Sequence, residues 1–327
     1  MKKQEFISEL KAALAHTPDD VREEIIDDIN EHFSEGASQG QSEEDICRNL
    51  GQPGSIAAQV LEEYARGTNP ANEYEKIRGG YEISIDKSFA GGEVRNVDIG
   101  LAIGNIYFTP STDGNFRVVL EGRYKHNKFV VENNGGLLVV KSIEPMMSFN
   151  LFRFNAKLEA TVYVPGQFAG EIKARSAAGN VSSGGISGKL NFKTAAGNVS
   201  VDGHLSGEIT LSTAAGNIAL ATKEARDLNL STAAGKIKAE VKKLSGDTKL
   251  TSSAGNVKLT AYEVEGNIKL STSAGNATAY LPANVNCRIK VTKPSIGSLH
   301  NELEGNPNSP YTLKATTSVG TIKLLAI

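Results

Sequence analysis

The residues of this chain that could do chemistry are scattered acids and isolated histidines. A glycosidase needs two carboxyl groups about 5 to 10 Å apart in a cleft. Seven acids of the repeat region stand at or near predicted corners without a recurrent pair: Asp202, Glu208, Glu224, Asp227, Asp247, Glu263 and Glu265. His126, His204 and His300 are isolated from serine and cysteine motifs, so a catalytic triad has no support. We therefore expect a protein that is not an enzyme, with a polysaccharide-processing β-helix enzyme as a distant alternative.

Metal and cofactor chemistry has little support either. Cys47 and Cys287 are the only cysteines and lie in different kinds of predicted element, so they build neither a disulfide framework nor a zinc site. Both are expected to be small buried hydrophobic residues. The many Gly-Asn pairs are not followed by helices and so are not phosphate loops. No cofactor and no nucleic acid partner are expected.

Two sets of charged residues are candidates for an interaction. Lysines accumulate towards the later repeats, and stacked lysines repel one another unless an anion lies near, although a solvated surface is the alternative. A second set lies on one N-terminal helix, where a solvated acidic face explains the residues better than metal or acid–base chemistry. The two sets are Lys236, Lys238, Lys249, Lys258 and Lys269, and Asp28, Glu31, His32 and Glu35.

The charge of the chain is divided unevenly along its length. The total is −2, but residues 1–66 hold 15 Asp and Glu against 6 Lys and Arg, which leaves 22 against 29 for the rest. The sequence therefore joins an acidic head of formal charge −9 to a mildly basic body of +7.

A short motif, such as TAAGN, occurs six times with small changes. The repeat that it marks sets the positions of the candidate residues between 170 and 279. Its glycines recur every 18 to 20 residues, the length of one solenoid coil: Gly179, Gly197, Gly216, Gly235, Gly255 and Gly275. A second corner mark stands nine residues before each of them, and apolar residues alternate with others between the marks. Period-two alternation interrupted by glycines indicates strand, corner, strand, corner. The predicted fold is mainly β, a parallel β-helix or β-solenoid, preceded by a small all-α domain.

The repeat also predicts which side chains face inward. Identical coils about 4.8 Å apart stack like upon like. A row of hydroxyls points inward as well, and we expect backbone carbonyls or one another to satisfy them. The predicted inner rows are Ile172/Leu190/Ile209/Leu228/Thr248/Ile268, Ala174/Phe192/Leu211/Leu230/Leu250/Leu270 and Val181/Val199/Ile218/Ile237/Val257/Ala277, with hydroxyls from Thr194, Thr213, Thr232, Ser252 and Thr272.

The N-terminal residues read as a small helical module. Phe6, Leu10 and Leu14 have helical spacing, and Ser42 is a capping candidate for a third helix. The run Asp28-Ile29-Asn30-Glu31-His32-Phe33, followed by Ser42-Glu43-Glu44-Asp45-Ile46, Leu50-Gly51 and Pro53, resembles the HAAS signalling domain. That resemblance covers residues 1–66 and implies a protein partner for the head.

Residues 67–78 are a linker by composition, and the β-solenoid is expected to occupy residues 79–327. Residues 110–165 are less regular and would protect one open end. The apolar segment from Met146 to Phe154 would be a cap or a contact patch. The repeats, with Tyr280-Leu281-Pro282 and the terminal SVGTIKL, resemble the "putative adhesin" β-repeat family, DUF4097.

The two resemblances together imply a bacterial envelope-stress protein of the Lia type, found in Gram-positive bacteria. The first hypothesis for function is a non-enzymatic sensor or scaffold that binds a protein partner through its head. The alternative is an adhesin-like binder of an anionic polymer or lipid through its basic coils. The sequence contains neither a secretory signal nor an apolar stretch near 18 residues, which predicts a cytoplasmic chain with membrane or envelope association as the alternative.

Overall fold

The computed structural model describes residues 1–17, 19–38, 40–66, 81–124, 129–142, 157–204 and 207–327. The predicted linker, 67–78, and the segment from Met146 to Phe154 lie outside these residues. The chain divides into two compact units, one with the described helices and the other with the described strands. Each unit is therefore considered by itself.

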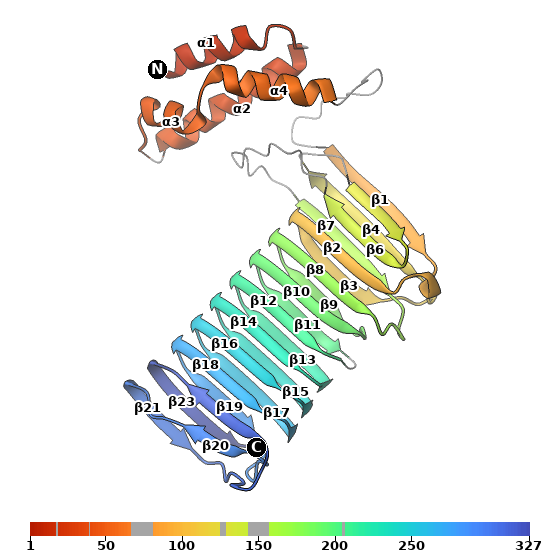
Figure 1. The fold of residues 1–327 in the computed structure, drawn as a ribbon, viewed down its shortest axis with the longest axis vertical. Coiled ribbons are helices and arrows are strands. Elements are labelled where there is room, and N and C mark those ends of the chain that lie inside the picture. The colour runs from red at the N-terminus through yellow and green to blue at the C-terminus, as the bar shows by residue number, and fades with distance from the viewer. Residues whose placement is uncertain (18, 39, 67–80, 125–128, 143–156, 205–206) are drawn as a thin grey trace. The chain divides into compact units, whose positions relative to one another are not determined.

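The described residues of the helical unit form four α-helices around a small apolar core (Figure 1). They are α1 (Lys3–Ala13), α2 (Asp19–Ser38), α3 (Glu43–Leu50) and α4 (Pro53–Arg66). Phe6, Leu10 and Leu14 are fully buried, and the ring of Phe6 meets Phe33 edge to face at 6.0 Å. The Ser42 hydroxyl accepts a hydrogen bond from the Asp45 N–H at 3.2 Å, which confirms the predicted cap of α3.

The strand unit is a solenoid whose coils each contribute one strand to each of two faces (Figure 1). Face 1 consists, in spatial order, of β5 (Phe129–Asn134), β6 (Leu137–Ser142), β2 (Asn96–Ile103), β8 (Glu171–Ala178), β10 (Lys189–Ala196), β12 (Ile209–Ala215), β14 (Leu228–Ala234), β16 (Thr248–Ala254), β18 (Ile268–Ala274), β22 (Thr312–Thr316) and β20 (Arg288–Val291). Face 2 consists of β1 (Tyr81–Phe89), β4 (Phe116–Tyr124), β7 (Lys157–Val164), β3 (Asn105–Pro110), β9 (Val181–Gly184), β11 (Val199–His204), β13 (Ile218–Ala225), β15 (Ile237–Ser245), β17 (Val257–Glu265), β19 (Ala277–Leu281), β23 (Val319–Ala326) and β21 (Ile296–Asn301).

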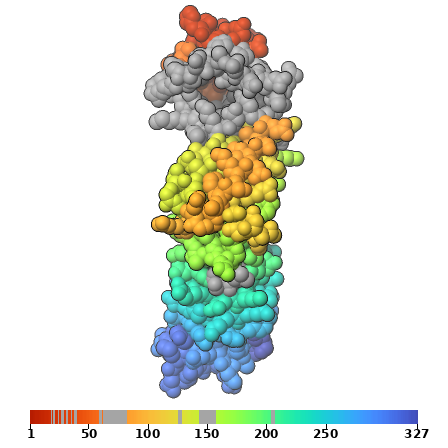
Figure 2. Space-filling model, turned by 90° about the vertical axis from the view of Figure 1, so that its right-hand side faces the viewer, coloured from red at the N-terminus to blue at the C-terminus, as the bar shows by residue number. Residues whose placement is uncertain are grey.

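The predicted fold class is confirmed, because neighbouring coils pair in parallel through the whole repeat region. The predicted inner rows are in register, and Leu230 is fully buried between Leu211 and Leu250. Figure 2 shows the coils stacked in order from green to blue. Antiparallel pairs between described strands occur only towards the N-terminal end, at β1–β4, β4–β7 and β5–β6. The irregular region before residue 165 therefore adds strands of opposite direction to the N-terminal end of the stack.

The order of coils in space differs from their order in the chain at both ends of the solenoid. The coil β2–β3 lies between β6–β7 and β8–β9. After β2–β3 the chain therefore forms the coil β6–β7 on the N-terminal side and then continues with β8–β9 on the opposite side. At the other end, the last strands, β22 and β23, insert between β18–β19 and β20–β21. The C-terminal strands are therefore not at the end of the stack.

The corner glycines are required because the coils approach closely there. Gly235 has φ +157°, and a Cβ at this position would overlap the carbonyl oxygen of Gly216 in the preceding coil. The same carbonyl accepts a hydrogen bond from the Thr232 hydroxyl at 3.1 Å. Equivalent bonds join Thr194 to Gly179 and Thr213 to Gly197, so the expectation that backbone carbonyls satisfy the inward hydroxyls is confirmed.

Candidate functional site

The five lysines predicted as candidates lie at three different places on the solenoid. Lys249 and Lys269 are adjacent on the outer surface of face 1. Lys238 and Lys258 are adjacent on the outer surface of face 2. Lys236 follows the corner glycine Gly235 and lies on neither face. The structure therefore brings these residues together only in pairs.

On face 1, the pair of Lys249 and Lys269 is part of a row of four lysines. Lys249 of β16 pairs in register with Lys269 of β18, Lys269 with Lys314 of β22, and Lys314 with Lys290 of β20. All four side chains are exposed, and none has an ion-pair partner among the residues that the structure describes. We call Lys249, Lys269, Lys314 and Lys290 the lysine row. Sequence reasoning missed its second half because the spacing of the repeat changes after Gly275.

Polar residues flank the lysine row on both sides. Two residues further along each strand are Thr251, Ser271 and Thr316, and the Thr316 hydroxyl donates to that of Ser271 at 3.2 Å. On the other side stand Asp247, Asn267, Thr312 and Arg288. The Asp247 carboxylate accepts a hydrogen bond from the Asn267 amide at 2.9 Å. The surface beside the row thus carries the hydroxyls of Ser271 and Thr316 and one acid, Asp247, at its inner end, while the Thr251 hydroxyl is buried.

The lysines of face 2 make a less continuous row. Lys258 pairs in register with Thr278, and Thr278 pairs with Lys323. The Lys258 ammonium lies 4.5 Å from the centre of the Tyr280 ring, a cation–π contact that occupies it in part. On face 2, therefore, Thr278 separates Lys258 from Lys323, and Lys258 already contacts the Tyr280 ring.

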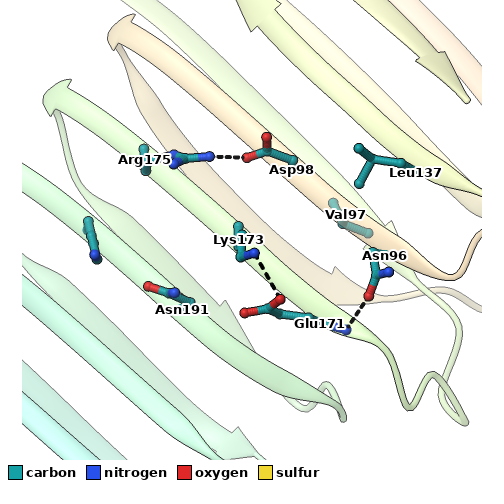
Figure 3. A pocket seen from close by; sticks show the side chains of 9 residues that line it. Asn96, Val97, Asp98, Leu137, Glu171, Lys173, Arg175 and Asn191 are labelled. Atoms are coloured by element: carbon teal, nitrogen blue, oxygen red, sulfur yellow. Dashed lines mark hydrogen bonds and ion pairs between the residues drawn. The ribbon is translucent and has the colours of Figure 1, made fainter. Parts of the chain in front are cut away.

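A groove near the N-terminal end of face 1 is the second candidate site (Figure 3). Figure 3 shows Asp98 of β2 facing Arg175 of the neighbouring strand β8, and Glu171 facing Lys173 along β8 itself. The Asp98 carboxylate lies 2.6 Å from Arg175 and 3.2 Å from Lys141, and Glu171 lies 3.0 Å from Lys173. Sequence reasoning had singled out neither acid. The partners of Asp98 come from β6 and β8, far from it in the chain, whereas Glu171 pairs with Lys173 two residues further along the same strand.

The Asp98 carboxyl in this groove is held ionised. Its partial burial favours the neutral acid, but the hydrogen bonds and charges of Arg175 and Lys141 outweigh burial and hold the pKa of Asp98 below its usual value. A general acid near neutral pH needs the opposite shift. The groove is therefore suited to structural ion pairing rather than to proton donation.

The acids that the sequence singled out take structural roles where their side chains are bonded. Lys189 and Arg226 both contact the Glu208 carboxylate, and the hydrogen bond from Lys189 is the main cause that lowers the pKa of Glu208. Asp227 accepts a hydrogen bond from the backbone N–H of Asp247 at 3.0 Å. These contacts tie one coil to the next.

The remaining candidates are placed as follows. Asp28, Glu31, His32 and Glu35 lie on α2, but their side chains are outside the described residues, as are His126 and the side chain of His204. His300 contacts Glu302 at 2.8 Å. Both cysteines are buried as predicted, and burial raises the pKa of the Cys287 thiol to about 11. Among the described residues, no group of three or more His, Cys, Asp or Glu could hold a metal ion, and no helix is long and apolar enough to cross a membrane.

Comparison with known proteins gives two family matches. Residues 94–325 match the family Toastrack DUF4097, and residues 5–59 match HAAS. Both resemblances seen in the sequence are therefore confirmed. No curated protein matches the chain significantly.

The chain also resembles solved structures at low sequence identity. A "putative lipid binding protein" from Parabacteroides distasonis is 14% identical, with 75% of this chain and 98% of that chain covered and a TM-score of 0.39. A "putative adhesin" from Bacteroides fragilis is 18% identical, with 74% and 97% covered and a TM-score of 0.32. At these values no ligand can be carried over to this chain.

Proposed function

The chain belongs to the Toastrack DUF4097 family, and on that premise we propose that it is a non-enzymatic, adhesin-like binding protein whose basic coils hold an anionic polymer. The lysine row supports this proposal most directly. Four ammonium groups on adjacent strands raise one another's electrostatic energy, and an anionic ligand relieves that repulsion. Residues 228–327 hold twelve Lys and Arg against six Asp and Glu, so the later coils attract anions as a whole.

The carboxylates of the groove support the non-enzymatic part of the proposal. Asp98 and Glu171 are both paired with cations, and the lowered pKa of Asp98 disfavours a role as a general acid. The in-register outer rows of the described coils offer a ligand a continuous surface. Such extended surfaces are typical of solenoid proteins that bind other molecules.

The helical head has a second proposed role, which the HAAS match favours. In this proposal residues 1–66 form a domain that binds a protein partner, residues 67–78 are a linker, and residues 79–327 form the ligand-binding solenoid. A partner on the head would make the protein a sensor or scaffold at the bacterial envelope, as the resemblance implies. If this is right, fractionated cells will contain the protein with the envelope, and deletion of residues 1–66 will remove the partner but leave polyanion binding intact.

Binding of the intact chain to long-chain inorganic polyphosphate, measured by fluorescence anisotropy over a series of salt concentrations, tests the main proposal. Association should be detectable at low salt and should weaken steadily as salt rises, because displaced counterions drive it. Uncharged dextran of similar length is the control and should not bind. Absence of polyphosphate binding at low salt would contradict the proposal.

A further inference from the structure

We propose that the lysine row on face 1 is the binding site and that its ligand is a linear polyanion lying across the strands, along the axis of the coils. This inference rests on the proposed function and adds the location of the site, its direction and the class of ligand. It depends on the spatial order of the last coils, which places Lys314 between Lys269 and Lys290.

The spacing of the four lysines follows from strand pairing. In-register parallel strands lie about 4.8 Å apart, so the row from Lys249 to Lys290 spans about 14 Å in a straight line. Side chains at paired positions leave the sheet in the same direction. A chain with an anionic group every few ångströms could therefore meet all four ammonium groups while staying extended.

The surroundings favour an anion in this place. The lysines are exposed and have no ion-pair partner among the described residues, so a ligand has no internal carboxylate to displace. Ser271 and Thr316 line one side of the row with hydroxyls, and Arg288 stands beside Lys290 on the other side. Asp247 opposes binding only at the Lys249 end, and its carboxylate is already bonded to Asn267.

A polymer fits this surface better than a lipid membrane. Membrane attachment combines cations with apolar side chains that enter the bilayer. The large exposed apolar side chains of the described solenoid lie elsewhere: Leu137 is on β6 at the other end of face 1, Tyr262 is on face 2, Ile296 and Val319 stand at a corner, and Ile327 ends the chain. The lysine row itself is bordered by hydroxyl, amide and charged groups.

The test uses the full-length chain and two matched variants. The first replaces the row, with Lys249→Gln, Lys269→Gln, Lys314→Gln and Lys290→Gln. The second makes the same change of charge on face 2, with Lys223→Gln, Lys238→Gln, Lys242→Gln and Lys323→Gln, all of them exposed. Circular dichroism and melting confirm that both variants fold, which exposed Lys→Gln changes should permit.

Long-chain polyphosphate, pyrophosphate and vesicles of phosphatidylglycerol are the three probes. We expect the face 1 variant to lose at least tenfold in affinity for polyphosphate, and its slope of log affinity against log salt to fall by about 3. The face 2 variant should change less than threefold. Pyrophosphate should bind far more weakly than the polymer, because it engages at most part of the row.

Each other result overturns the inference in a distinguishable way. Equal losses of polyphosphate affinity in both variants would mean that net charge alone attracts the polymer. The lysine row would then not be the binding site, while the proposed function would stand. Binding to vesicles without binding to polyphosphate would show that the ligand is a lipid surface and not a polymer. Failure of the unaltered chain to bind polyphosphate would remove the inference together with the proposed function.

Discussion

At the scale of single residues, two neighbouring cations keep the Asp98 carboxyl ionised. Its side chain is only 14% exposed and is held between Lys141 and Arg175. Its folded pKa is lowered, so its contribution to stability is complete above its unfolded pKa of about 4 and is lost as pH falls through the folded pKa. Asp98 therefore makes the N-terminal coils sensitive to acid.

Replacement of Asp98 tests this directly. Asp98→Asn should lower the free energy of unfolding at pH 7 by about 1 to 2 kcal/mol, because two cations lose a charged acceptor. The difference from the unaltered protein should disappear as the pH is lowered below the folded pKa. The control is Asp86→Asn, which disturbs an exposed pair with Arg117 and should have a much smaller effect. A difference that persisted unchanged into acid would contradict this account of Asp98.

At the scale of the repeating elements, a row of asparagines holds successive coils together. The Asn180 side chain accepts a hydrogen bond from the backbone N–H of Asn198 at 2.8 Å, and Asn198 accepts one from Asn217 at 2.9 Å. Asn217 accepts from the N–H of Lys236 at 2.9 Å. Lys236 has no acceptor in its side chain, so the row is interrupted before Asn256. The repeated motif contains these asparagines, but the sequence did not predict the bonds that they make between coils.

Restoring the row of asparagines at position 236 should stabilise the solenoid. Lys236→Asn supplies an acceptor for the backbone N–H of Asn256 and should raise the free energy of unfolding by about 1 kcal/mol, seen as a higher melting temperature. Lys236→Ala is the matched control, since it removes the same charge without adding an acceptor. Equal shifts in the two variants would show that the removal of the lysine, and not the new hydrogen bond, caused the change.

At the scale of the whole molecule, the strands form a unit with its own core. The buried apolar side chains of the solenoid make one cluster, and those of the helices make another. A solenoid coil is stabilised by its neighbouring coils, so the stack does not need the helices to bury its core. The division of the chain into a head and a repeat domain is therefore testable as independent folding.

A fragment of residues 79–327 should fold without the head. Far-UV circular dichroism should show strand and almost no helix, and the melting temperature should match that of the solenoid transition in the full chain. The full chain should add a helical signal to the same strand spectrum. An unfolded or helical fragment would contradict independent folding of the repeat domain.

The sequence by itself determined the repeating unit of this protein. Period-two alternation decides which side of each strand is apolar, and a corner glycine every 18 to 20 residues decides where the next strand begins. Buried positions such as Leu230 and the inward hydroxyl of Thr232 could therefore be predicted correctly. These properties are local, because each depends on residues within one coil and its copy in the next.

Only the tertiary structure decided which strands became neighbours at the two ends. Backbone hydrogen bonding is almost independent of side-chain identity, so the spacing of the repeat does not say whether β20 or β22 adds to β18. In the folded protein β22 does, and this choice aligns Lys314 and Lys290 with Lys249 and Lys269. The two faces also separate Lys258 from Lys269, which the sequence had grouped together. The candidate site exists because pairing between strands distant in the chain brought its four lysines into one line.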